Sequence, residues 1–119
     1  MSAEQDLYST INGASAVTAL VGTNIHVDRR DEEDALPAIV YQRGATENIE
    51  GLSGAILAAK VTLVVECMAD SRSGAEAIAD AVVSAIKAAT HDFAVTARVA
   101  SYDDETQTHI TTLAIVKNE

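Results

Sequence analysis

A long alternating stretch, residues 55–68, constrains the fold of this chain more than any other feature of the sequence. One set of alternate positions carries only small or apolar side chains: Ala59, Val61, Leu63, Val65 and Cys67. The other set mixes polar and apolar side chains: Lys60, Thr62, Val64, Glu66 and Met68. A period of two with one apolar face is typical of a strand in a sheet that buries one side. The stretch therefore predicts a sheet with a single core face.

The segment that follows repeats its apolar residues at helical spacing instead. Its apolar stripe consists of Ala75, Ile78, Ala79, Val82, Ile86 and Ala89. Ser73 and Glu76 have the spacing of a capping box, which predicts the helix start. Acidic residues lie early and Lys87 lies late, in agreement with the helix dipole. We expect one long helix packed on the sheet.

The rest of the chain indicates shorter elements of both kinds. Ala3, Leu7 and Ile11 share one face of a first helix that stops at Asn12-Gly13, and Gly22 stops a second short helix. Strand-like runs occupy residues 24–28, 38–44, 93–99 and 108–116, with turns or loops at 47–54 and 103–106. The order predicts a single α+β domain over residues 1–119. It has a mostly antiparallel sheet of about five strands, one long helix on it and short N-terminal helices.

Composition excludes several classes of function. The 119 residues carry 18 acidic and 8 basic side chains, for a net charge of −10. Tight binding of free nucleic acid or of an anionic membrane needs clustered bases, which the chain lacks. No apolar run is long enough to span a bilayer, and the N-terminus does not resemble a signal peptide. With Cys67 as its single cysteine, the chain has no internal disulfide, and we expect it to fold in the cytoplasm.

Candidate chemistry is sparse. The acidic run at residues 28–34 lacks the central glycine of a calcium loop and contains two arginines, so we expect no metal site there. His26, His91 and His109 come from three different elements, and nothing in their spacing forces them to converge on zinc. Cys67 lies on the apolar face of its strand, which favours a buried and inert thiol. The sequence thus indicates no catalytic residue, cofactor or bound metal.

The order of these features resembles the tail-completion, or tail-terminator, family of long-tailed bacteriophages, over about residues 7–117. The matching pieces are Leu7-Tyr8, Val17, Ala19 to Gly22, Ile25, Leu36-Pro37, Ile39 to Gln42, Lys60 to Glu66 and Ala75 to Ile86. Ala38 departs from the pattern, which favours a larger residue after the proline.

The resemblance implies a structural virion protein and not an enzyme. Members of this family form a six-membered ring that caps the tail tube and ends tube polymerisation. Such a ring joins the tail to the head, so the implied partners are the major tail tube protein and a head-completion or connector protein. Genomic DNA passes through the centre without specific binding. The implied location is the tail or neck of the virion, after assembly in the cytoplasm of the host bacterium.

Acidic loops are the candidates for the lumen or the subunit interface of such a ring, because acidic groups around a bore repel phosphates. The candidate residues are Arg29, Arg30, Asp31, Glu32, Glu33, Asp34, Glu47, Glu50, Asp103, Asp104 and Glu105. Two other interpretations stay open. The chain is compatible with a monomeric adaptor or ligand-binding module, and with a small enzyme that uses His26 and His91. Molar mass in solution separates a ring former from both.

Overall fold

The computed structural model describes residues 3–22, 24–27, 36–50, 56–89, 93–105 and 107–118. The acidic run from Asp28 to Asp34, with Arg29 and Arg30 in it, lies outside the described residues, as does His91. The elements in chain order are α1 (Ala3–Asn12), α2 (Ser15–Val21), β1 (Ile25–Val27), β2 (Ala38–Glu50), β3 (Ile56–Ala69), α3 (Arg72–Ala88), β4 (Phe93–Asp103) and β5 (Thr108–Asn118). The predicted α+β class is confirmed.

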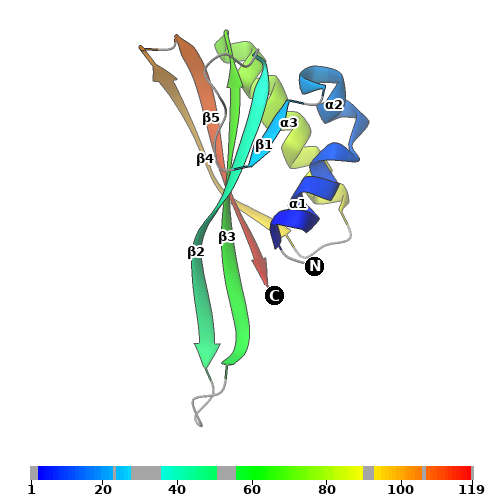
Figure 1. Cartoon of the computed structure of the whole chain (residues 1–119), viewed down its shortest axis with the longest axis vertical. Helices are drawn as coiled ribbons and strands as arrows, with labels where there is room; N and C mark the ends of the chain where they lie inside the picture. Colours follow the sequence, from blue (N-terminus) through cyan, green and yellow to red (C-terminus); the bar gives the residue numbers. More distant parts are fainter. Residues whose placement is uncertain are drawn as a thin grey trace.

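A single five-stranded sheet forms the framework, with the strand order β1-β2-β3-β5-β4. β1 runs parallel to β2, and every other neighbouring pair is antiparallel. The central row of the sheet aligns Tyr41, Val65 and Leu113. All three helices lie on the same side of the sheet (Figure 1). The other face of the sheet carries no described helix.

The core fills the space between the helices and the sheet. Val61, Leu63, Val65 and Cys67 of β3 are fully buried, which confirms the alternation seen in the sequence. Five of the six residues of the predicted stripe are buried in α3, with Val82 at the centre, whereas Ala89 is the half-buried C-cap residue that follows the helix. Apolar burial of this kind is the main source of folding stability in a chain with so few aromatic residues.

The N-terminal helices end where the sequence predicts. Leu7 and Ile11 of α1 are fully buried. Gly22 closes α2 with φ of 60°, and its backbone N–H donates to the carbonyl oxygen of Thr18 at 2.8 Å. Glycine adopts this left-handed conformation without the cost that a Cβ imposes.

The start of α3 lies two residues earlier than the sequence predicts. Ser71, not Ser73, is the N-cap residue, and its hydroxyl accepts a hydrogen bond from the N–H of Gly74 at 3.1 Å. Ser73 lies inside the first turn and is exposed. The capping box of Ser73 and Glu76 is therefore wrong, because the helix begins two residues earlier than that box requires.

β4 also departs from the simple alternation. Phe93 and Val95 are half-buried against the core, but the register shifts between Val95 and Ala97. A bulge inserts one residue and turns the following side chains over. Arg98 is therefore opposite the buried Leu113 in the register of β4 and β5, while the side chain of Val99 is 60% exposed.

The hairpin of β2 and β3 is longer than the sequence indicates. The prediction ended the strand at residue 44 and put Glu47 and Glu50 in a loop, but both belong to β2. Their backbones pair with Lys60 and Ile56, respectively, across the hairpin. β5 pairs with β3 only as far as Lys60, so among the described residues the outer part of the hairpin consists of two strands. This hairpin projects beyond the helices and gives the molecule its length of 51 Å, against 30 and 21 Å in the other directions (Figure 1).

Candidate functional site

The turn between β4 and β5 carries three consecutive acidic residues, Asp103, Asp104 and Glu105. Asp103 ends β4, and its Oδ1 accepts a hydrogen bond from the backbone N–H of Glu105 at 3.0 Å. Asp104 and Glu105 are exposed at the tip. The Asp103 side chain closes this turn locally, as short acidic side chains commonly do. Two carboxylates are thereby presented to solvent at one end of the sheet.

The other predicted candidates do not join this turn. Glu47 and Glu50 lie toward the far end of the hairpin, whereas the β4–β5 turn lies at the opposite end of the sheet, beside the last residues of β3. Figure 1 shows the two ends well separated. The candidates in the run 29–34 lie outside the described residues. The described acidic segments therefore mark opposite ends of the molecule and not one cluster.

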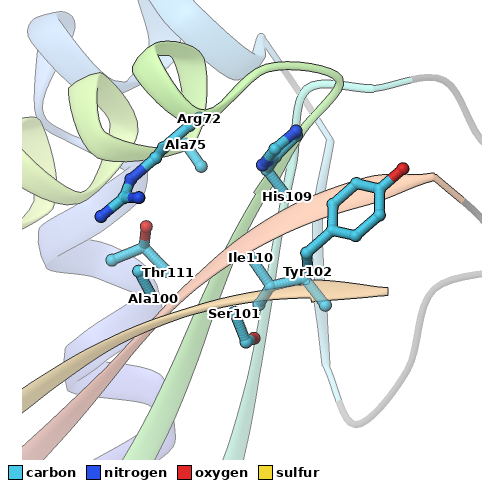
Figure 2. Close-up of a pocket in the computed structure, with 8 residues that line it drawn as sticks. All are labelled: Arg72, Ala75, Ala100, Ser101, Tyr102, His109, Ile110 and Thr111. Carbon is cyan, nitrogen blue, oxygen red and sulfur yellow. The ribbon is translucent and has the colours of Figure 1, made fainter. Parts of the chain in front are cut away.

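A cavity of about 260 Å³ lies beside the acidic turn, between the N-terminus of α3 and the ends of β4 and β5. Figure 2 shows Arg72 reaching toward Thr111, while the hydroxyl of Tyr102 points away from the helix. Tyr102 and His109 are opposite each other in the sheet, and their ring centroids are 4.7 Å apart. The contact between the two rings packs the last residues of β4 against the first residues of β5. The cavity could not be predicted from the sequence, because its lining comes from three separate elements.

An ion-pair cluster built on Arg98 fastens β4 to α3 below this cavity. The guanidinium donates to Asp80 at 2.9 Å and also pairs with Glu76, which accepts a further hydrogen bond from the hydroxyl of Thr111 at 3.0 Å. The hydrogen bond with Arg98, helped by that with Thr111, lowers the pKa of Glu76. The hydrogen bonds with Glu76 and Asp80 raise the pKa of Arg98. The bulge in β4 makes this cluster possible, because it turns Arg98 to the helix side.

Two ion pairs hold α1 against the sheet. Lys117 of β5 donates to Asp6 at 2.6 Å, with both side chains largely buried. Arg43 of β2 donates to Glu4 at 2.6 Å near the surface, and this contact lowers the pKa of Glu4. These contacts join the N-terminus of the chain to the two strands on either side of β3.

Chemistry at the remaining candidates is limited. Cys67 is fully buried, and burial raises the pKa of its thiol to about 12, so the thiolate does not form at neutral pH. His26 is half-buried in β1, and the ring of His109 packs against that of Tyr102 at a tilt of 52°. Among the described residues, histidine, cysteine and acidic side chains form no group of three that could hold a metal ion. No helix in the described ranges is long and apolar enough to cross a membrane.

The fold and this charge distribution can be compared with known proteins. A family model described as tail completion protein gp17 matches residues 5–115, nearly the whole chain. This chain belongs to the tail completion protein gp17 family. Membership confirms the resemblance found in the sequence and identifies a structural protein of a bacteriophage tail. No curated protein matches the chain.

The fold of this tail completion protein also occurs in a solved particle. A chain in the virion of a native gene transfer agent particle is similar, with a TM-score of 0.74 and 17% sequence identity. The match covers 98% of this chain and 92% of the other. At this identity the likeness shows that the two share a fold over their whole lengths.

Proposed function

We propose that this tail completion protein forms a six-membered ring that caps the tail tube and ends its polymerisation. The ring joins the tail to the head, with the major tail tube protein on one side and a head-completion or connector protein on the other. The family match over residues 5–115 carries this proposal. Assembly takes place in the cytoplasm of the host bacterium, and the mature location is the neck of the virion.

The ring lets genomic DNA pass without binding it. The acidic turn of Asp103, Asp104 and Glu105 fits a position at one mouth of the bore, because its exposed carboxylates repel phosphates. Rotational symmetry multiplies this charge. The chain as a whole carries a net charge of −10, which adds to the repulsion. The run from Arg29 to Asp34 and the pair Glu47 and Glu50 remain candidates for the lumen or the subunit interface.

Tube assembly tests this function directly. Purified tail tube protein is allowed to polymerise on preformed tail initiators, with and without this protein, and tube lengths are measured by electron microscopy. We expect tubes of defined length that no longer grow once this protein is added. The Leu63→Asp variant, whose core charge prevents folding, is the inactive control. Continued growth of the tubes in the presence of folded protein would contradict the proposal.

A further inference from the structure

The sheet ends in a long strand with a free edge. β4 contains 11 residues and is the last strand of the sheet, beyond β5. In the parts of the chain that the structure describes, no strand pairs with its outer side. Every residue of β4 is at least partly exposed. Its backbone N–H and C=O groups on that side therefore form a template for another strand.

β4 has few of the features that protect such edges. Natural edge strands are commonly very short or carry proline, lysine or inward-pointing charges. β4 has no proline and no lysine, and the charge of its one inward-pointing base, Arg98, is neutralised by the ion pairs with α3. The bulge at Val95 and Ala97 bends the strand but leaves most of the edge open. An edge of this length and composition is expected to be covered in the functional assembly.

A second free edge lies on the opposite side of the same sheet. β1 pairs with β2 only from Ile39 to Tyr41. From Gln42 to Glu50, the outer side of β2 has no strand partner among the described residues. This stretch includes the two-stranded part of the hairpin, and isolated two-stranded hairpins are only marginally stable in water. The hairpin therefore also favours an additional strand.

The polarity of the two edges makes a second copy of this chain the occupant that fits. β2 and β5 run in one direction, and β3 and β4 run in the other. A neighbour in the same orientation would place its β2 beside β4 as an antiparallel pair, the pairing that already dominates the sheet. Gln42 and Ala97 even lie in one row, through Val64 and Ala114. Two different edges that match in this way give a heterologous contact, which builds a closed ring when the rotation from one copy to the next divides a full turn.

We propose that the free edge of β4 pairs antiparallel with the free edge of β2, from Gln42 onward, on the next copy of this chain. The contact joins the separate sheets into one continuous sheet around the ring. This inference rests on the proposed function, because it assigns the surfaces that build the proposed ring. The bore and the tube-binding faces are then formed by other surfaces of the subunit.

Cysteine cross-linking tests the pairing. Gln42→Cys is combined in one chain with a cysteine at Ala94, Ala97, Val99 or Ser101 of β4, all exposed positions. The scan allows for a stagger between neighbouring sheets, which closed sheets require. A short bis-maleimide reagent is applied to the free protein at high concentration and to assembled tails. Native Cys67 can stay, because it is buried and its pKa is about 12.

The inference predicts a covalent ladder on denaturing gels, from dimers up to a closed ring, for one or two neighbouring β4 positions. Each variant with only one introduced cysteine should stay monomeric on the gel. The control pairs Gln42→Cys with Ser84→Cys on the exposed face of α3, and it should give no ladder. Native mass spectrometry of the same samples records the oligomer independently.

The other outcomes separate the two proposals. A ring in the mass spectrum without a ladder at any β4 position would overturn the edge pairing and leave the ring intact. Dimers from a single β4 cysteine would show a symmetric β4–β4 contact, and a cross-link to the tube protein alone would show a different occupant. Either result contradicts the inference. A monomer in solution and on assembled tails would overturn the proposed function itself.

Discussion

At the scale of residues, the two ion pairs that fasten α1 differ mainly in burial. Lys117 and Asp6 have side chains that are 12% and 6% exposed, whereas the pair of Arg43 and Glu4 lies closer to solvent. Removing one member of a buried pair leaves a charge with too little compensation, at a cost of about 3–5 kcal/mol. A surface pair contributes about 0–1 kcal/mol.

We therefore expect Lys117→Met to lower the free energy of unfolding by about 3 kcal/mol. Arg43→Met is the matched control, because its partner Glu4 lies on the same helix, α1, as Asp6, and it should cost less than about 1 kcal/mol. Urea denaturation of both variants measures the difference. The double variant Asp6→Leu/Lys117→Met should recover part of the loss, since no buried charge then remains. Equal losses for the two single variants would show that burial does not set the strength of these pairs.

The Arg98 cluster predicts a loss of stability in acid. The pKa of Glu76 is lowered in the folded state, so the unfolded chain binds the proton more readily. The stabilising contribution is complete above the ordinary pKa of about 4.5 and disappears as the pH falls through the lowered value. Glu76→Gln removes this titration. Between neutral pH and pH 3, the melting temperature should fall more steeply for the natural protein than for the variant. An equal fall in both proteins would show that Glu76 does not cause the loss of stability in acid.

At the scale of elements, the N-cap of α3 gives a matched pair of serines. Ser71 accepts the hydrogen bond from Gly74, while Ser73 is an exposed first-turn residue. Replacing an N-cap serine by alanine costs about 1 kcal/mol. Ser71→Ala should therefore destabilise the protein by about that amount, and Ser73→Ala should be nearly neutral. If chemical denaturation shows a larger loss of stability for Ser73→Ala than for Ser71→Ala, Ser73 is the N-cap residue, as the sequence pattern predicted.

The elements also show what the sequence could and could not predict. The alternation in β3 and the stripe of α3 were readable because burial imposes one period on many neighbouring residues. The bulge in β4 was hidden, since Val99 continues the local alternation of Phe93 and Val95 although its side chain is exposed. The extension of β2 to Glu50 was hidden too, because its partner residues in β3 decide it and not its own polar sequence. The cavity at Arg72 and the free edges depend on topology alone.

At the scale of the whole molecule, acidic side chains lie at the ends of the sheet, and, among the described residues, unpaired backbone groups lie along its two edges. The acidic turn is predicted to meet passing DNA. Reversing Asp103, Asp104 and Glu105 to lysine should leave the ring intact but slow DNA ejection from assembled particles. The effect should be larger at low salt, because salt screens the repulsion between carboxylates and phosphates. At 0.1 M salt, exposed charges more than about 10 Å apart are largely screened from each other.

The same reversal at Glu47 and Glu50, at the other end of the sheet, is the companion variant. Ejection is followed by fluorescence of a DNA-binding dye at two salt concentrations. If the turn variant assembles normally and ejects at the natural rate at both, the turn does not lie at the bore.

A reconstruction of the virion neck by electron cryomicroscopy would show the proposed ring itself. We expect six copies of this 12.4-kDa chain in one ring at the head-proximal end of the tail tube. In that ring, β4 of each copy should lie beside β2 of the next. A neck in which this chain forms no ring, or a particle in which it lies at another position, would contradict the proposed function.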